Sequence, residues 1–224
     1  GGGGRDSNGH LTPGGEWKHA SEWPPAQASP PLKFFLGSGG HLGSTAPGSE
    51  APDRYRYDPV DPVHTKGGRH GPECIQNQTV QRSDILTFLS EPLANDVDIT
   101  GAPSAALWVS TDAPSTDFTA KLIDVYPDGY AAILLEEALR VQRQGTGAQQ
   151  IVITLGSTSN LFARGHRIRL DVSSSSFPKL EPNPNPAHNA IYHDRAHTSY
   201  LEVPVTFGSK RPEAADTSRE PHRR

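Results

Sequence analysis

The sequence contains a single cysteine and no methionine. One thiol can form neither a disulfide within the chain nor a cysteine metal cluster, so Cys74 is expected to be a small, partly buried apolar residue. Because no methionine stands at the first position or anywhere else, we expect that the chain does not begin at its own start codon. We therefore expect it to be part of a longer protein.

Long apolar runs and strong charge are also missing. Apolar residues make up 33% of the 224 residues, and no run reaches the roughly 18 residues that a spanning helix requires. The glycine-rich start lacks the basic and apolar regions of a signal peptide. A net charge of −4 gives no electrostatic reason to expect nucleic acid or an anionic membrane as a partner. Nothing in the sequence assigns a compartment.

Turn residues are abundant, with 22 glycines and 21 prolines, and they separate short segments with strand-like patterns. Such segments joined by Gly, Pro, Asp and Ser predict an all-β fold, an antiparallel β-sandwich of the jelly-roll kind. The predicted strands cover residues 32–36, 84–90, 96–100, 104–111, 117–126, 130–141, 149–155, 166–174 and 199–207.

These patterns divide the chain into three parts. Residues 1–31 predict an irregular linker or a segment wrapped on another body, and residues 208–224 predict a disordered charged tail. The jelly roll is expected over residues 32–207, with turn-rich coil where X-Pro pairs repeat after residue 52. Pro204 cannot donate to a central ladder, so it places the last predicted strand at a sheet edge.

Asp124 interrupts the core-facing alternation of the strand predicted over 117–126, in which Phe118, Ala120 and Leu122 share one parity. An unpaired buried carboxylate is costly, so the side chain requires a partner, a break in the strand or water. We expect either an ion pair with an arginine, a β-bulge, or an ordinary acid at the sheet rim. The candidate partners are Arg140, Arg167 and Arg169.

Few residues in the sequence form a pattern typical of catalysis. The G-x-S-x-G nucleophile motif is absent, and the serines at 173–176 are interpreted as a strand end whose hydroxyls satisfy nearby backbone groups. His188, His193, Asp194 and His197 lie close together in sequence and could ligate a metal if a loop brought them together. A loop held by side-chain hydrogen bonds is the alternative. We predict no catalytic residue, metal or cofactor for this chain.

Three long segments in order resemble a known family. They read SEPLANDVDITGAPSAALWVSTDAPSTDFTAKLIDVYPDGYA, then STSNLFARGHRIRLDVSSSSFPKLEPNPNP, then AIYHDRAHTSYLEVPV. Together with EWPP at 22–25, and with YDPVDPV at 57–63 followed by Gly67-Gly68, they resemble the C-terminal domain of the X-Pro dipeptidyl-peptidase and cocaine esterase (CocE/NonD) class of serine hydrolases. In that family the domain is a galactose-binding-like jelly roll, in agreement with the strand pattern.

The resemblance implies a non-catalytic role. In this class the Ser, Asp and His belong to a preceding α/β-hydrolase domain that acts on ester or amide substrates, and the jelly roll packs on that domain. The stretch after the Gly-Gly pair helps to line the acyl pocket there. Carried over by position, the pocket candidates lie between residues 69 and 75 and are Arg69, His70, Glu73, Cys74 and Ile75.

The sequence departs from the family pattern at one loop. Ser176, Glu181 and Pro182 stand where relatives tend to have Asn and an Asp-Arg pair, so the contacts that hold this loop are expected to differ. A different function also stays open at this point, a free-standing carbohydrate-binding module, because jelly rolls of this type often bind sugars on a loop face.

Overall fold

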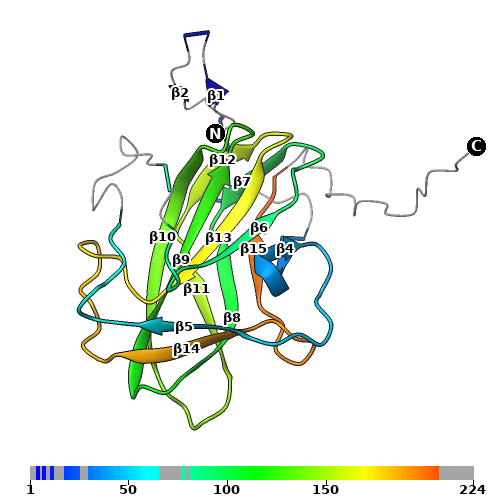
Figure 1. The fold of residues 1–224 in the computed structure, drawn as a ribbon. Helices are drawn as coiled ribbons and strands as arrows, with labels where there is room; N and C mark the ends of the chain where they lie inside the picture. Colours follow the sequence, from blue (N-terminus) through cyan, green and yellow to red (C-terminus); the bar gives the residue numbers. More distant parts are fainter. Residues whose placement is uncertain are drawn as a thin grey trace, which may run out of the picture.

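The computed structural model describes residues 4–5, 7–8, 11–12, 18–25, 30–65, 77–78 and 81–206 (Figure 1). Their regular structure is β-strand apart from one short 3-10 turn, η1 (Ser38–Gly40), which confirms the all-β prediction. The described residues form no helix that could cross a membrane. The strands are β1 (Gly4–Arg5), β2 (Leu11–Thr12), β3 (Leu32–Gly37), β4 (His41–Gly43), β5 (Asp53–Tyr57), β6 (Leu86–Ser90), β7 (Val97–Gly101), β8 (Ser104–Thr111), β9 (Ser115–Val125), β10 (Ala131–Gln142), β11 (Gln149–Thr154), β12 (Thr158–Phe162), β13 (Arg167–Ser173), β14 (Ala187–Tyr192) and β15 (Tyr200–Val203).

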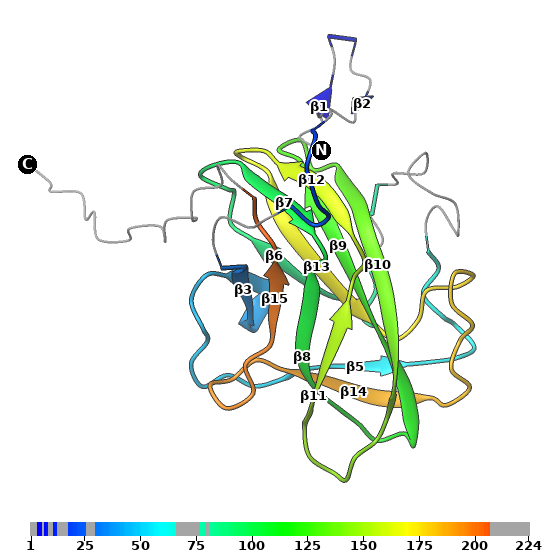
Figure 2. The same ribbon diagram turned by 180° about the vertical axis from the view of Figure 1, so that it is seen from behind.

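Eleven of these strands form one continuous sheet that folds over into two layers. Its order is β10-β9-β13-β6-β4-β3-β15-β8-β14-β5, and β11 pairs with the free edge of β8. Figure 1 shows β10, β9, β13 and β6 as one layer, and Figure 2 shows β11, β8, β15 and β3 on the opposite side. Neighbouring strands are antiparallel except for the short β4–β6 contact. This arrangement is the sandwich that the turn-rich strand pattern predicts.

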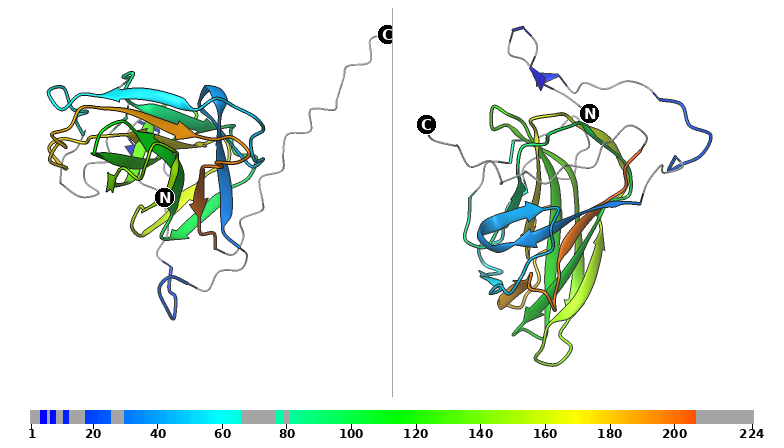
Figure 3. Two further views of the ribbon diagram at one scale, coloured as in Figure 1. Left: turned by 90° about the horizontal axis from the view of Figure 1, so that it is seen from below. Right: turned by 90° about the vertical axis from the view of Figure 1, so that its right-hand side faces the viewer.

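Two strands close one end of the sandwich. Asn189 of β14 pairs with Tyr55 of β5 and with Thr111 of β8, so β14 joins β5 to the main sheet. Figure 3 shows β5 and β14 side by side across this end. The expected coil after residue 52 is therefore wrong over β5, and β14 and β12 were also missing from the predicted strands. In β14 the consecutive polar residues His188 and Asn189 interrupt the alternation of a strand, and β5 lies in a stretch rich in glycine and proline that was interpreted as coil.

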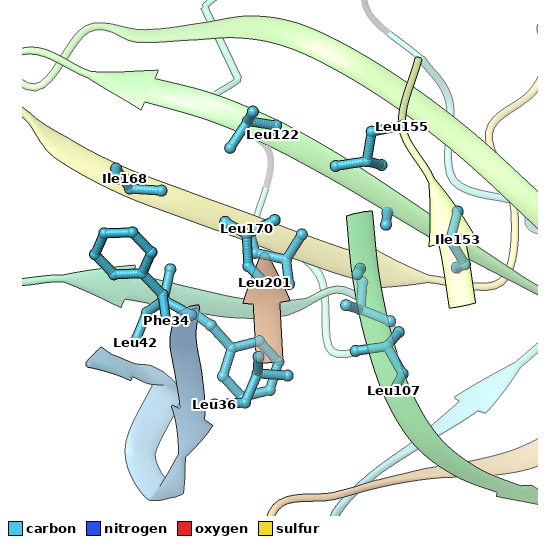
Figure 4. Close-up of a cluster of buried hydrophobic side chains, with 14 of the residues drawn as sticks. Phe34, Leu36, Leu42, Leu107, Leu122, Ile153, Leu155, Ile168, Leu170 and Leu201 are labelled. Atoms are coloured by element: carbon cyan, nitrogen blue, oxygen red, sulfur yellow. The ribbon is translucent and has the colours of Figure 1, made fainter. Parts of the chain in front are cut away.

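The core lies between the two layers. Leu107, Leu122, Leu170 and Leu201, each from a different strand, are fully buried and meet there (Figure 4). On β13 the apolar parity that includes Leu170 faces this core, as the alternation predicts. Burying a side chain of this size contributes roughly 1.5–3 kcal/mol relative to exposure, so these contacts dominate the stability of the sandwich.

Strand β9 is buried on both of its faces along almost its whole length. Its core face carries Phe118 and Leu122, whereas Lys121 and Ile123 belong to the opposite face and are equally buried. A second layer of chain must therefore lie over the outer face of β9, and polar groups on that face must find partners within the protein.

Asp124 has a partner that the sequence did not suggest. Its side chain is 1% exposed and Oδ1 lies 2.8 Å from Nδ1 of His166. Burial raises the pKa of Asp124, and the hydrogen bond from His166 opposes that rise. The three predicted arginine partners are wrong. Arg140 binds Asp117 and Arg169 binds Asp171, while Arg167 donates to the carbonyl of Ser90.

The bulge expected at Asp124 lies elsewhere. The register shifts on β10 between Ile133 and Leu135, opposite Ile123 and Leu122, while Asp124 itself pairs regularly with Ala132. The prediction of an edge strand at the end of the domain is also wrong. β15 lies between β3 and β8, and Pro204 follows its last paired residue, so the missing N–H interrupts no ladder.

A buried histidine ties the β14–β15 connection to the start of β5. His193 is fully buried, with Nδ1 3.1 Å from Oε2 of Glu50 and Nε2 3.0 Å from Oδ2 of Asp53. Glu50 also accepts hydrogen bonds from the backbone N–H and the hydroxyl of Ser38, and these lower the pKa of Glu50. Both ring nitrogens of His193 thus face carboxylates. We infer that both donate, which requires the charged imidazolium.

We predict that Asp124→Ala lowers the free energy of unfolding by about 2 kcal/mol, because it leaves the buried imidazole of His166 without its acceptor. Asp124→Asn keeps an acceptor and should cost less. Urea denaturation measures both changes. Glu137→Ala, on the exposed side of β10, is the control and should stay within about 0.5 kcal/mol. Equal losses for Asp124→Ala and Glu137→Ala would contradict the pairing.

We further predict a pH-dependent role for His193. Hydrogen bonding to Asp53, although opposed by burial, raises the pKa of His193 above its ordinary value. Stability from this pair is therefore complete below the ordinary pKa of about 6.5 and is lost as pH rises through the raised value. His193→Gln should cost about 2 kcal/mol at pH 6 and less at pH 9.

Denaturation of the wild type and of His193→Gln at pH 6 and pH 9 measures the difference between their free energies of unfolding, which should be smaller at pH 9. His188→Gln is the control, because the side chain of His188 is 74% exposed. A difference between wild type and His193→Gln that stays constant from pH 6 to pH 9 would show that the imidazole is not charged in the fold.

Candidate functional site

The outer face of the β10-β9-β13-β6 layer is covered by connecting segments, which we call the covering layer. It comprises residues 58–65, 77–78, 81–85 and 174–186. Arg169 of β13 donates from Nη1 to the carbonyl of Gln78, and Tyr57 at the end of β5 donates to the carbonyl of Asn183. In Figure 1 the connections after β5 and after β13 lie together at one edge of the sandwich. This edge is the candidate site.

The covering layer holds both ends of the segment 66–76. On one side, the backbone N–H of Thr65 donates to the carbonyl of Phe177 at 2.8 Å. On the other side, Gln78 donates its backbone N–H to the carbonyl of Ala131, and Asn77 accepts from the N–H of Ala131. The two ends are thus attached to the start of β10 and to the segment after β13.

The predicted pocket residues lie outside the described part of the chain. They are Arg69, His70, Glu73, Cys74 and Ile75. Their predicted role stays a prediction. The expectation that Cys74 is partly buried therefore also stays a prediction. What the structure adds is the attachment of the residues that precede and follow them.

Charged side chains under the covering layer are paired with one another. Lys121 Nζ lies 3.3 Å from Oε1 of Glu136, and Lys179 Nζ lies 3.6 Å from Oε2 of the same carboxylate. Lys179 also donates to the backbone carbonyl of Glu136. Asp117 and Asp171 are buried and each accepts two hydrogen bonds, from Arg140 and Arg169 respectively, although the Arg140 side chain is 54% exposed. Buried charges require partners, which these pairs supply. The Lys179–Glu136 pair links the covering layer to β10.

The loop after β13 is held by backbone and asparagine hydrogen bonds. Leu180 donates its backbone N–H to the carbonyl of Ser176, and Asn185 donates its side-chain amide to the hydroxyl of Ser115. Glu181 is exposed, and the hydroxyl of Ser176 is buried without a hydrogen-bond partner among the described residues. Lys179 and the asparagines therefore carry the attachment of this loop.

The serines at 173–176 bind distant as well as nearby groups. Ser173 shares a hydrogen bond with Thr119 and donates to the carbonyl of Ser175, while Ser174 bonds to the hydroxyl of Tyr55 at 2.8 Å. Ser175 accepts the backbone N–H of Val63. The prediction of local backbone contacts captured only part of this. The serines link β13 to the covering layer and to β5.

The histidines near residue 190 do not converge. His193 is the buried bridge between Glu50 and Asp53, whereas His188 lies 2.8 Å from Asp112 at the surface. His197 bonds to Asp194 and packs edge-on against Trp108, with ring centroids 5.0 Å apart. Among the described residues, no group of three or more His, Cys, Asp and Glu side chains could hold a metal. Side-chain hydrogen bonds hold this loop, in agreement with the alternative to the metal site.

One acid–histidine pair has the geometry of a general-base dyad. Asp124 Oδ1 faces Nδ1 of His166, whose ring is covered by that of Tyr126 at a centroid distance of 4.5 Å. The His166 side chain is only 7% exposed. A general base must also reach the proton that it removes. Within the described ranges no serine hydroxyl hydrogen-bonds to a histidine, and the pair links β9 to the residue that precedes β13.

Comparisons with known proteins agree with the resemblance drawn from the sequence. Residues 4–202 match the family described as the X-Pro dipeptidyl-peptidase C-terminal non-catalytic domain. The chain is 36% identical over 231 aligned residues to the cocaine esterase of Rhodococcus sp. (strain MB1 Bresler), and the match covers 85% of this chain and 40% of that protein. The chain thus spans well under half the length of this relative.

Solved structures show the same fold. An aminopeptidase from a marine sediment Thaumarchaeota archaeon superimposes with a TM-score of 0.74 at 23% identity, covering 90% of this chain and 39% of that one. An alpha-amino acid ester hydrolase gives a TM-score of 0.72 at 24% identity, with 88% and 39% covered. These matches do not favour the alternative of a free-standing carbohydrate-binding module. The chain belongs to the family of X-Pro dipeptidyl-peptidase C-terminal non-catalytic domains found in CocE/NonD-type hydrolases.

Proposed function

We propose that this domain packs on the α/β-hydrolase domain of its parent chain and helps to form the acyl pocket of an enzyme that cleaves ester or amide bonds. The attachment of both ends of segment 66–76 carries this proposal. Thr65 and Gln78 are fixed by backbone hydrogen bonds to different parts of the sandwich. A segment held at both ends by a packed scaffold can present side chains to a neighbouring domain at little entropic cost.

The named relatives support the choice of chemistry. One is a cocaine esterase and another is an alpha-amino acid ester hydrolase, and in both the matching region covers about two fifths of the protein. In the proposed parent, a serine nucleophile outside this chain forms the acyl-enzyme, and an oxyanion hole stabilises the tetrahedral intermediates. The part played by residues 69–75 is to limit the volume available to the acyl group, which decides between substrates.

We predict that the 224-residue chain alone does not hydrolyse p-nitrophenyl esters above the uncatalysed rate, because the nucleophile belongs to the parent's other domain. Release of p-nitrophenolate measures this directly. The positive control is the full-length parent enzyme at the same concentration of active sites. Turnover by the chain alone that a serine-directed inhibitor abolishes would contradict the proposal.

We predict that Ile75→Ala in the full-length enzyme shifts acyl preference towards larger groups. Removing methylenes from an apolar pocket changes kcat/KM ratios by roughly tenfold or more per group. The measurement is kcat/KM for p-nitrophenyl acetate, butyrate and benzoate. Val152→Ala is the matched control, because Val152 is an aliphatic residue that is 55% exposed on β11. If the ratios of kcat/KM among the three esters are unchanged in Ile75→Ala, or shift equally in Val152→Ala, the pocket role is contradicted.

A further inference from the structure

Two segments far apart in the sequence form a short ladder within the covering layer. Phe177 donates its backbone N–H to the carbonyl of Val63, and its own carbonyl accepts the N–H of Thr65, both at 2.8 Å. The N–H of Val63 is satisfied by the hydroxyl of Ser175, also at 2.8 Å. His64 and Phe177 are thereby paired as parallel neighbours. The backbone of Phe177 is fixed by contacts on both sides.

The side chain of Phe177 is nevertheless 40% exposed. Its ring meets the ring of His64 edge-on at a centroid distance of 5.5 Å and an angle of 79°. Val60, three residues before Val63, is 90% exposed. Five large apolar residues are exposed among the described residues, and two of them, Val60 and Phe177, lie in the covering layer. Rigidly held aromatic side chains at the surface are typical anchors of protein interfaces.

We propose that Phe177, together with His64, is a docking surface for the catalytic part of the same parent chain. This inference rests on the proposed function. Two observations point to that partner. Relatives carry more than half of their length outside the matching region. The ladder directly precedes segment 66–76, through Thr65.

The test replaces Phe177 by the photo-cross-linking residue p-benzoylphenylalanine in the full-length parent enzyme. After irradiation and proteolysis, mass spectrometry should identify peptides from the part of the chain that precedes this domain. The same probe at Val152, which is 55% exposed on β11, is the control and should give no such peptide. Mixing isotopically heavy and light enzyme separates links within one chain from links between copies.

Several outcomes would overturn the docking surface. These are links from position 177 only to residues of this domain, links only between copies, and no link at all. As a second measurement, Phe177→Ala should shorten the half-life of the full-length enzyme at its inactivation temperature by about fivefold, since it removes a partly exposed aromatic from an interface. Val152→Ala should leave that half-life unchanged. An unchanged half-life in Phe177→Ala would also count against docking.

The two proposals can fail separately. If Ile75→Ala leaves the acyl preference unchanged but position 177 cross-links to the preceding domain, the pocket role fails and the docking surface stands. If Ile75→Ala shifts the preference but position 177 gives no such link, the domain contacts its partner elsewhere.

Discussion

Burial of β9 on both faces is the constraint on which the rest of this structure depends. One face joins the apolar core, so the other must be covered by additional chain, although it carries the charged side chain of Lys121. A buried ammonium without a partner would cost several kcal/mol. Glu136 on β10 lies opposite Lys121 in the register and supplies that partner. The same requirement explains why Arg140 and Arg169 each hold a carboxylate with two hydrogen bonds.

The covering layer follows from this constraint. Lys179 reaches the same carboxylate as Lys121 and bonds to the backbone of Glu136, so the loop after β13 closes over the face that it protects. Arg82 links two other parts of the covering layer, residues 58–65 and 81–85, by binding both Asp61 and Asp84. Its hydrogen bonds lower the pKa of Asp61. Segments that contain few apolar residues are thereby ordered by charge pairs rather than by a core of their own.

The alternation of apolar and polar residues predicted β13. On β13, Ile168, Leu170 and Val172 identify both the strand and its core face. β14 was missed because AHNAIY places His188 and Asn189 inside the strand, and Asn189 faces inward to bond Ser174. The partner of Asp124 could not be predicted from the sequence either. It depends on the register between β9 and β13, and His166 lies one residue before β13 begins.

Functional prediction followed a different route. No local pattern identified the site, because a domain without a nucleophile has no catalytic motif, and the family became visible only through several ordered segments taken together.

The structure adds a chemical reason why its histidines suit a supporting role. Both ring nitrogens of His193 are engaged by Glu50 and Asp53, so neither is free to accept a proton from a nucleophile. His166 is likewise committed, since its hydrogen bond to Asp124 offsets the cost of a buried carboxylate. The hydrogen bonds of His193 and His166 fix the positions of their rings and leave the bonded ring nitrogens unavailable for proton transfer. The proposed role at the acyl pocket would need that rigidity, because displacing a contact by a fraction of an ångström weakens the site that it supports.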